Sequence, residues 1–270
     1  MKISWLTPGP PGSVGRDSST GNLCFESASV ALRPRNLKTF FDELDVIQEM
    51  LDTFLSRVET PRILEAGCGS AAHLHFGAKA HLTGIDISTE QLDRNEALDT
   101  KILGDIENYP LPESTFDLII CFDVLEHLPN PEKALANFAS SCAPQGMIIL
   151  AMPNVYSFVG FVTKYTPLWF HVFVYRRFYH LKWAGTEGRG PFHTYLRRSI
   201  SMNSIRQYAQ ENRFTVQYCD SHVRPKLAEI KERHRLVYAG LRLSSLSLKV
   251  LSLGKIDDMR SDVFVVLRKA

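Results

Sequence analysis

After Pro61 the sequence alternates short apolar runs with segments of helical character, and this alternation constrains the fold more than any other feature. A strand that is followed by a helix and a second strand pairs in parallel, through a right-handed crossover. The runs LIICF and MIIL are apolar on both faces, which is typical of strands buried inside a parallel sheet. The predicted strands of this stretch are 62–66, 81–87, 101–104, 116–122 and 146–152, and the predicted helices are 89–98 and 131–142.

The flanking segments complete this α/β plan. Apolar residues recur at helical spacing over 37–58, which predicts an amphipathic helix that covers one sheet face or helps to roof a site. Residues 154–198 are dense in aromatic and basic side chains and show no clean alternation. Helical character returns later in the chain, and the last two predicted strands can form an antiparallel edge. The predicted late helices are 202–212 and 226–253, and the late strands are 214–219 and 262–267.

Composition narrows the class of protein. The 31 basic and 29 acidic side chains leave a net charge of +2, which argues against a nucleic-acid partner. The five cysteines are scattered and never spaced as CxxC, so we expect neither a disulfide framework nor a thiolate zinc site. The sequence has neither a signal peptide nor an apolar run long enough to span a membrane. We therefore expect a cytoplasmic protein, attached to a membrane at most peripherally, with an N-terminal arm over 1–36 and one domain over 37–270.

The segment ILEAGCGSA begins in a predicted strand and ends in a predicted helix. Gly67 and Gly69 free the backbone to turn sharply and let a ligand approach closely. The same residues fit the G-x-G-x-x-G/A pattern of nicotinamide dinucleotide sites. Glu65, however, would lie poorly beside a pyrophosphate and suits a cationic cofactor with an amino group and a sulfonium. Asp86 ends the second strand, where a carboxylate can accept hydrogen bonds from both ribose hydroxyls.

Four blocks together carry a family resemblance over roughly residues 60–154. They are ILEAGCGS, GIDIS, LGDIENYPLPESTFDLIICFDVLEHLPNPEKAL and APQGMIILAMPN. In order and spacing they resemble the class I S-adenosylmethionine-dependent methyltransferases, especially the quinone-biosynthesis type. The resemblance implies a doubly wound, mostly parallel seven-stranded sheet in the order 3-2-1-4-5-7-6, with the seventh strand antiparallel.

The resemblance also implies how the cofactor S-adenosylmethionine would lie. Glu65, Gly67 and Gly69 would surround its methionine moiety, with Cys68 between the glycines as a small space-filling residue. Asp86 would hold the ribose. The remaining implied contacts are Ile87, Asp105 and Ile106 around the adenine, and Phe122 beside the sulfonium.

Candidate catalytic residues follow the fourth predicted strand. If the chain makes a helical turn there, Asp123, Glu126 and His127 share one face and can form a base or bind a divalent cation. The DVLEH block resembles the E-x-x-E-H segment of metal-assisted methyltransferases, although Asp at its first position shortens the reach. His193 stands where some of those enzymes have a further histidine, so the predicted metal set is Asp123, Glu126, His127 and His193. A metal-free site, in which His127 acts as a base or orients the acceptor, is the favoured alternative.

The segment 155–183 follows the fifth predicted strand and is rich in aromatic and basic side chains. It can form a lid over an apolar acceptor, a contact with anionic lipid, a surface for nucleic acid, or a subdomain with its own core. We favour an acceptor-binding lid, defined as residues 154–198. Its predicted acceptor contacts are Trp169, Phe170, Phe173 and Tyr195, and the predicted catalytic groups are His127, His193 and Asp123.

The sequence thus predicts a methyltransferase that acts on an oxygen of a hydrophobic small molecule, such as a quinone precursor, a polyketide or a lipid-like metabolite. Two rival hypotheses stay open. A methyltransferase fold can instead catalyse a rearrangement or cyclisation, or serve a binding role. A nicotinamide oxidoreductase fits Glu65 poorly. The sequence leaves the acceptor and the oligomeric state open.

Overall fold

The computed structural model describes residues 40–70, 74–77, 79–177, 181–182, 184–186, 192–256 and 259–270. All of them belong to the unit Asn36–Ala270. The predicted N-terminal arm over 1–36 lies outside the described residues.

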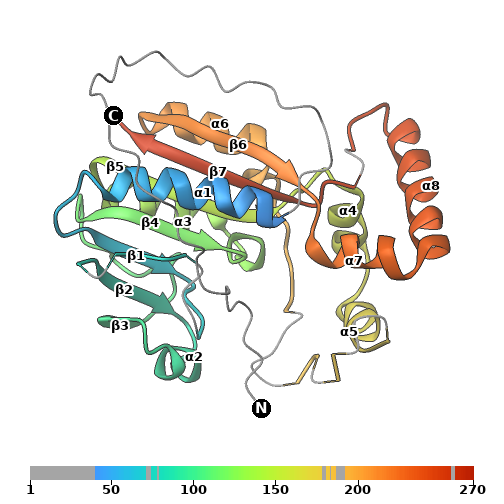
Figure 1. The fold of residues 1–270 in the computed structure, drawn as a ribbon, viewed down its shortest axis with the longest axis horizontal. Coiled ribbons are helices and arrows are strands. Elements are labelled where there is room, and N and C mark those ends of the chain that lie inside the picture. The colour runs from blue at the N-terminus through green and yellow to red at the C-terminus, as the bar shows by residue number, and fades with distance from the viewer. Residues whose placement is uncertain are drawn as a thin grey trace, which may run out of the picture. The chain divides into compact units, whose positions relative to one another are not determined.

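A single sheet of seven strands organises this unit (Figure 1). Its order is β3-β2-β1-β4-β5-β7-β6, and β7 is antiparallel to both β5 and β6, as predicted. The other neighbouring strands pair in parallel, which brings their carboxyl ends to one edge. The strands are β1 Arg62–Ala66, β2 His81–Asp86, β3 Thr100–Leu103, β4 Phe116–Phe122, β5 Cys142–Pro153, β6 Phe214–His222 and β7 Asp262–Lys269.

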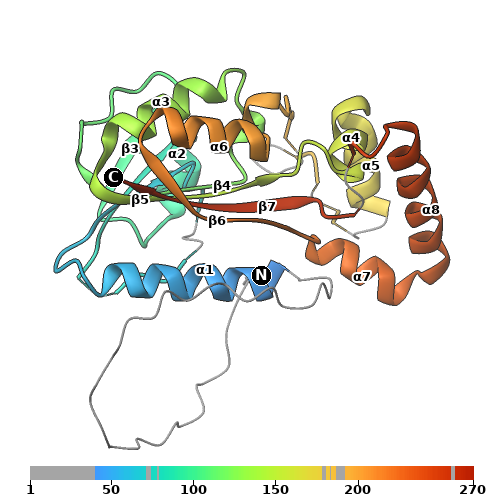
Figure 2. The same ribbon diagram turned by 90° about the horizontal axis from the view of Figure 1, so that it is seen from above.

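Helices cover both faces of the sheet, as the view from above shows (Figure 2). Helix α1 (Phe40–Leu55) lies on one face and buries Ile47, Leu51 and Phe54 against the core there. Helices α3 (Pro131–Ser141) and α6 (Met202–Glu211) lie on the opposite face, over a second core. The short helix α2 (Thr89–Arg94) ends earlier than predicted, because Asn95 leaves the helical conformation with ψ 93°.

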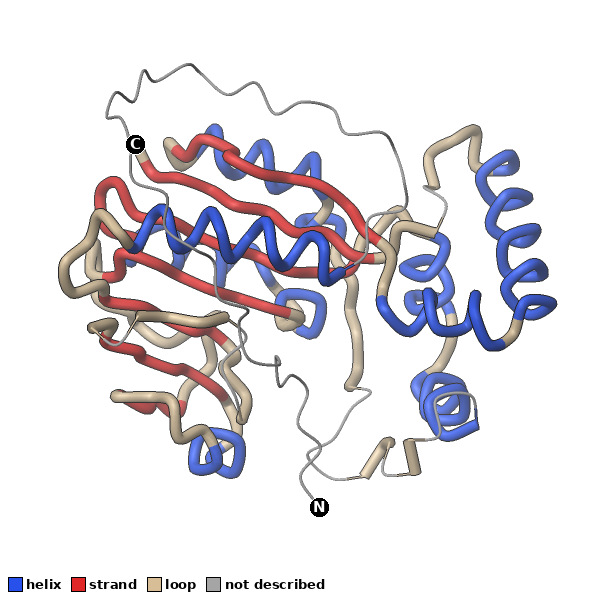
Figure 3. The backbone as a smooth tube through the Cα atoms, in the orientation of Figure 1, coloured by secondary structure: helices blue, strands red, loops and turns tan. Residues whose placement is uncertain are grey.

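Four further helices lie beyond the carboxyl edge of the parallel strands (Figures 1 and 3). Two follow β5 and two lie between β6 and β7. A small core joins α4, α7 and α8, and it packs Val223, Leu227 and Met259 against Phe158 and Tyr238. The helices are α4 Phe158–Tyr165, α5 Leu168–Arg177, α7 Pro225–Arg233 and α8 Arg235–Leu251. No helix among the described residues is long and apolar enough to cross a membrane.

The prediction of one continuous helix over 226–253 is wrong. Helix α7 ends at Arg233 and α8 begins at Arg235, because His234 between them has non-helical angles, φ −133° and ψ 62°. The apolar periodicity continues through this break because Leu227, Tyr238 and Leu241 all pack on the same small core. The apolar periodicity of the sequence therefore does not predict the break at His234.

A buried histidine lies where α1 meets the late strands. His222 ends β6, is 1% exposed, and its ring stacks on Phe264 with centroids 4.8 Å apart. The ring of Phe40 on α1 lies 5.5 Å from the His222 ring, centroid to centroid. Within the described part of the chain neither ring nitrogen has a hydrogen-bond partner. Burial lowers the pKa of His222, against a smaller opposing effect of Asp262.

This burial predicts an acid-sensitive fold. As the pH falls below the ordinary histidine pKa of 6.5, the unfolded chain takes up a proton that folded His222 resists, so the free energy of unfolding decreases. His222→Phe keeps a ring against Phe264 and removes this dependence. Denaturant unfolding between pH 7 and pH 5 should show a shallower loss of stability for His222→Phe than for the wild type. The exposed His81→Phe is the matched control, and an equal slope in all three proteins would contradict the expectation.

Candidate active site

A tight turn follows β1 at the carboxyl edge of the sheet. Gly67 and Gly69 adopt left-handed backbone angles, φ +69° and +54°, which residues with a side chain rarely adopt. A Cβ atom at Gly67 would lie 2.3 Å from Cγ2 of Val124, on the loop after β4. Buried Asn95 stabilises the turn, because its Nδ2 donates to the carbonyl oxygens of Cys68 and Gly69 at 3.4 and 3.3 Å. Gly67 therefore lets the loops after β1 and β4 approach closely.

Two carboxylates flank this turn. Glu65 is 1% exposed, and its neighbours in register are Gly84 on β2 and Ile120 on β4. Asp86 ends β2 and accepts hydrogen bonds from the backbone N–H groups of Gly69 at 3.0 Å and Ser88 at 2.8 Å. The next residue, Ile87, is 77% exposed. The rim thus offers one buried carboxylate, one oriented carboxylate and one exposed apolar side chain.

Cys68 between the glycines is fully buried. Burial, followed by the charges of Asp86 and Glu65, raises the pKa of its thiol to about 12. The thiol therefore stays protonated at neutral pH and is a poor nucleophile. Its location agrees with the predicted space-filling role.

Three other predicted cofactor residues lie near the same edge, and their cofactor contacts stay predictions. Asp105 is exposed and its carboxylate accepts from the N–H of Glu107 at 2.9 Å and the Nδ2 of Asn108 at 2.7 Å. Ile106 is 4% exposed and packs in the core under α3 and α6. Phe122 is 5% exposed, with its ring 5.6 Å from that of Phe264.

The loop after β4 does not bring the three predicted acid–base residues onto one face. Asp123 has a left-handed φ of +54°, and the helical turn begins only at Leu125. Asp123 therefore stands outside the turn, and its Oδ1 lies 3.7 Å from Nη2 of Arg224. The predicted i, i+3, i+4 arrangement with Glu126 and His127 is wrong for this reason.

Arg224 connects three parts of the carboxyl edge. Its Nε donates to both carboxylate oxygens of Asp262, at 2.9 and 3.0 Å, while its Nη2 faces Asp123. It thereby links the segment after β6, the start of β7 and the tip of β4. The negative charge of Asp262 has the largest effect on the pKa of Arg224 and raises it above its usual range. No motif in the sequence predicts this ion pair, because its members lie 38 residues apart.

Buried Glu126 and half-buried His127 are neighbours on the 3₁₀ turn Leu125–His127. Glu126 is 4% exposed, and its Oε1 lies 3.8 Å from Nε2 of His127. Burial, and then the charge of Asp123, raises the pKa of Glu126 well above its usual value. Its Oε2 has no hydrogen-bond partner in the part of the chain that the structure describes.

His127 is held in one tautomer. Its Nδ1 lies 2.7 Å from the backbone carbonyl oxygen of His193. A carbonyl oxygen only accepts, so Nδ1 carries the hydrogen and Nε2 of the neutral ring keeps its lone pair. Burial lowers the pKa of His127, although the hydrogen bond to His193 opposes it. At neutral pH Nε2 is therefore a free base.

The carbonyl of His193 belongs to a strap, residues 192–197, that crosses the 3₁₀ turn. The N–H groups of Tyr195 and Leu196 donate to the carbonyl of Glu126 at 2.8 and 3.2 Å. Phe192 meets the His127 ring edge-on at 5.9 Å, and Tyr195 meets the His193 ring at 4.6 Å. The predicted residues Tyr195 and His193 thus lie at the site, and His193 holds His127 through its backbone.

The predicted acceptor contacts on α5 are accessible. Trp169 and Phe173 are 69% and 52% exposed, and they line a shallow groove with Val172, Arg176 and Arg177. Phe170 is half-buried beside the ring of Trp169. Helix α5 has no fully buried residue, so the alternative of a private core does not hold for this helix.

The predicted metal site is not formed. Among the residues that the structure describes, no three His, Cys, Asp or Glu side chains come together as ligands for a cation. Asp123 lies against Arg224, while His193 presents its carbonyl to His127. The proposed set of Asp123, Glu126, His127 and His193 is therefore corrected to a pair, Glu126 and His127.

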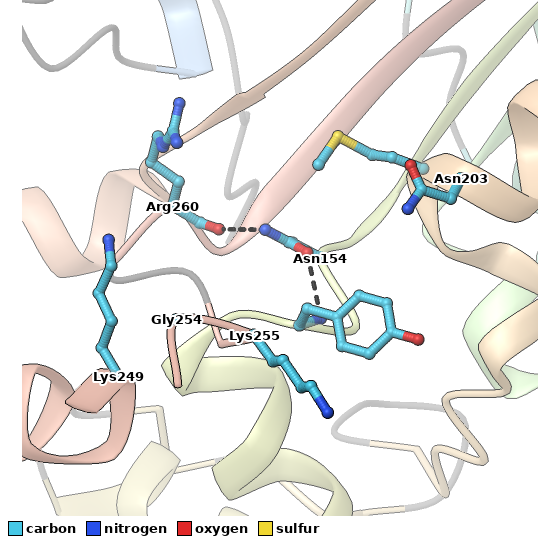
Figure 4. Close-up of a pocket in the computed structure, with 8 residues that line it drawn as sticks. Asn154, Asn203, Lys249, Gly254, Lys255 and Arg260 are labelled. Atoms are coloured by element: carbon cyan, nitrogen blue, oxygen red, sulfur yellow. Dashed lines mark hydrogen bonds between the residues drawn. The ribbon is translucent and has the colours of Figure 1, made fainter. Parts of the chain in front are cut away.

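A pocket of about 230 Å³ opens past the carboxyl end of β5 (Figure 4). Asn154 is fixed there, because its Nδ2 donates to the carbonyl of Arg260 at 3.0 Å and its Oδ1 accepts from Tyr156 N–H at 3.1 Å. The sequence pattern does not predict this pocket, because its walls come from widely separated segments. The lining residues are Asn154, Tyr156, Met202, Asn203, Lys249, Gly254, Lys255 and Arg260.

Comparisons with known proteins agree with this geometry. The family described as "Methyltransferase domain" matches residues 64–150. A putative sarcosine dimethylglycine methyltransferase from Galdieria sulphuraria has the same fold, with a TM-score of 0.51, 15% identity, and coverage of 85% of this chain and 86% of that one. The chain carries a class I S-adenosylmethionine-dependent methyltransferase domain.

Sequence relatives of this methyltransferase domain match over part of their length. The chain is 32% identical to an uncharacterized protein of Methanocaldococcus jannaschii over 44% of this chain and 52% of that protein. It is 29% identical to the ubiquinone biosynthesis O-methyltransferase of Coxiella burnetii, over 47% of this chain and 62% of that enzyme. The chain thus spans between about half and two thirds of these two relatives.

S-adenosylmethionine is the cofactor of this class of domain, and the rim residues fit it. A buried carboxylate at Glu65 suits a positively charged ligand, and the turn at Gly67 and Gly69 lets the backbone approach it closely. Asp86 is already oriented by two backbone N–H groups, as a group that accepts from ribose hydroxyls should be.

If Asp86 holds the ribose of the cofactor, two aspartate substitutions should differ in their effect on cofactor binding. Asp86→Ala removes an oriented carboxylate and should weaken the binding of S-adenosylhomocysteine by ~1–3 kcal/mol, the cost of unpairing buried polar groups. Asp93→Ala on α2 changes an exposed carboxylate and should leave the affinity unchanged. Calorimetry measures both. Equal affinities for the two variants, or tight binding of NAD instead, would contradict the assignment.

Proposed function

We propose that this methyltransferase domain methylates an oxygen of a small-molecule acceptor with a largely apolar body, using His127 as the base. One observation carries the proposal: Nδ1 of His127 is held 2.7 Å from the carbonyl of His193, which leaves Nε2 basic. A hydroxyl acceptor has to lose its proton during methyl transfer, and a positioned imidazole is the commonest group to take it.

The chain's residues can serve this reaction as follows. S-adenosylmethionine, when bound, supplies a methyl group on a positively charged sulfur. Nε2 of His127 would take the hydroxyl proton while the acceptor oxygen forms its bond to that methyl group. The bond between the methyl group and the sulfur would break, and the sulfur would leave as the neutral thioether of S-adenosylhomocysteine. The ring then carries a positive charge, which favours the ionised form of Glu126, whose Oε1 lies 3.8 Å from Nε2. His193 holds the ring through a backbone carbonyl, so the orientation of His127 does not require a side chain there.

We also expect a polar group of the acceptor to lie beside Glu126. Its buried Oε2 lacks a hydrogen-bond partner among the described residues, and such a group is costly to bury unless something pairs with it. An acceptor hydroxyl beside His127 would supply that partner. The raised pKa of Glu126 allows its carboxyl group to donate as well as accept.

The proposal of an apolar acceptor is supported by the aromatic side chains near the strap and on α5. Phe192 and Tyr195 are 52% and 39% exposed beside His127, and Trp169 and Phe173 present further aromatic surface. The match to ubiquinone biosynthesis O-methyltransferases, whose name states an oxygen-directed reaction, supports the choice of oxygen. Because no cation site is formed among the described side chains, we propose that turnover continues in excess chelator.

The proposal can be tested by substituting the two histidines. His127→Ala should lower kcat/KM by about 10²–10⁴-fold, the usual contribution of a general base. His193→Ala keeps the backbone carbonyl and should retain most activity. The acid limb of the wild-type pH profile should lie below pH 6.5, because burial lowers the pKa of His127.

The assay follows a labelled methyl group from S-adenosylmethionine into a panel of hydroxylated, aminated and apolar acceptors. Label on nitrogen or carbon, or full activity of His127→Ala, would contradict the proposed base. Equal losses for the two histidine variants would assign the His193 ring a catalytic role instead of its carbonyl.

The lid hypothesis predicts a separate result. Trp169 is 69% exposed, so Trp169→Ala should leave the melting temperature and the cofactor affinity unchanged while raising the KM for the acceptor. Leu103→Ala, at a 58% exposed position on β3, is the control for removing an exposed side chain. Unchanged acceptor kinetics for Trp169→Ala would show that α5 does not contact the acceptor.

A further inference from the structure

Only some of the apolar residues of helix α8 pack against the rest of the domain. Tyr238 and Leu241 pack on the small core of Val223, Leu227 and Met259, and Ser245 is 1% exposed. These inner positions follow helical spacing, so they mark one side of the helix. Figures 1 and 2 both show α8 on the outer side of α4 and α7.

The opposite side of α8 presents a continuous apolar stripe to solvent. Leu236, Leu243 and Val250 are 89%, 67% and 68% exposed, and seven-residue spacing places them nearly in line along the helix. Leu246 extends the stripe with an exposure of 58%, and Leu253, which follows the end of the helix, is 88% exposed. From Leu236 to Val250 the stripe is about 21 Å long, at 1.5 Å per residue. Side chains of this size are seldom left so exposed in a contiguous group.

A basic row runs beside the stripe. Arg235, Arg242 and Lys249 are also seven residues apart, and each directly precedes a member of the stripe. Since neighbouring residues differ by about 100° around a helix, the three cations flank the stripe along its length. The sequence of α8 contains no Asp or Glu. An apolar stripe with a basic flank is the pattern of helices that lie in a membrane interface.

We propose that α8 docks on the surface of a membrane that contains anionic phospholipids. The apolar stripe enters the boundary between headgroups and acyl chains, while Arg235 and Arg242 contact the anionic headgroups. Charge complementarity favours this occupant over a second copy of the chain. Two copies of α8 would bring two basic rows together without a carboxylate on either helix. This inference does not depend on which atom the domain methylates.

The proposal differs from the sequence-based expectation of a lipid contact at 155–183, which stays a prediction. Helix α5 has exposed Trp169 and Phe173 near Arg176 and Arg177, so both helices offer aromatic or aliphatic surface with basic neighbours. The two locations are separable by substitution, because each has its own pair of arginines.

Vesicle binding of the full chain tests the proposal. We expect binding to phosphatidylcholine vesicles that contain phosphatidylglycerol, and much weaker binding to phosphatidylcholine alone. Arg235→Gln/Arg242→Gln should weaken binding to the anionic vesicles by about 25-fold, since a basic residue near such a surface contributes about fivefold. Leu243→Ser/Val250→Ser should weaken it by at least about tenfold, because less apolar surface is buried. These residues are exposed, so circular dichroism should be unchanged.

Matched controls separate α8 from the rest of the surface. Val46→Ser changes an exposed valine on α1, and Arg206→Gln changes an exposed arginine on α6, and both should bind vesicles like the wild type. Failure of the wild type to bind anionic vesicles would overturn the proposal. So would a loss confined to Arg176→Gln/Arg177→Gln, or sedimentation that shows a dimer dissociated by Leu243→Ser/Val250→Ser.

Discussion

The parallel pairing of β1, β2 and β4 is the constraint on which the candidate site depends. It brings the ends of strands that are far apart in sequence to one edge, where Glu65, Asp86 and the loop after β4 meet. The close approach of these loops then requires a residue without a side chain at Gly67, since a Cβ atom there would collide with Val124. The antiparallel strand β7 adds Asp262 to the same edge, where Arg224 joins it to the tip of β4.

A second constraint acts through the strap. Residues 192–197 pair with the backbone of Glu126 and thereby place the carbonyl of His193 against Nδ1 of His127. A neutral, oriented imidazole beside a buried carboxyl group follows from this backbone contact. Glu126 and His127 thus lie beside the strap after β4, which is the arrangement that the proposed methyl transfer to a hydroxyl group requires.

Much of the fold was predictable from the sequence, because buried parallel strands are apolar on both faces and the glycine turn follows one of them. The positions of Glu65 and Asp86 at the ends of β1 and β2 followed from the same pattern. The details of the loop after β4 were not predictable. The segment around Asp123 has helical spacing, and no residue pattern there indicates the left-handed φ that Asp123 adopts. The hydrogen bond from His127 to His193 uses the backbone carbonyl, which every residue has, so the sequence does not identify it. The Arg224–Asp262 pair depends on β6 and β7 lying side by side.

The protonation state of His127 tests the account most directly. Nitrogen-15 NMR of the histidine rings, assigned with His127→Asn, distinguishes a protonated nitrogen from one with a free lone pair. The account predicts that at pH 7 His127 is neutral, with its hydrogen on Nδ1 and a lone pair on Nε2. A hydrogen on Nε2, or a doubly protonated ring at pH 7, would contradict the assignment of His127 as the base.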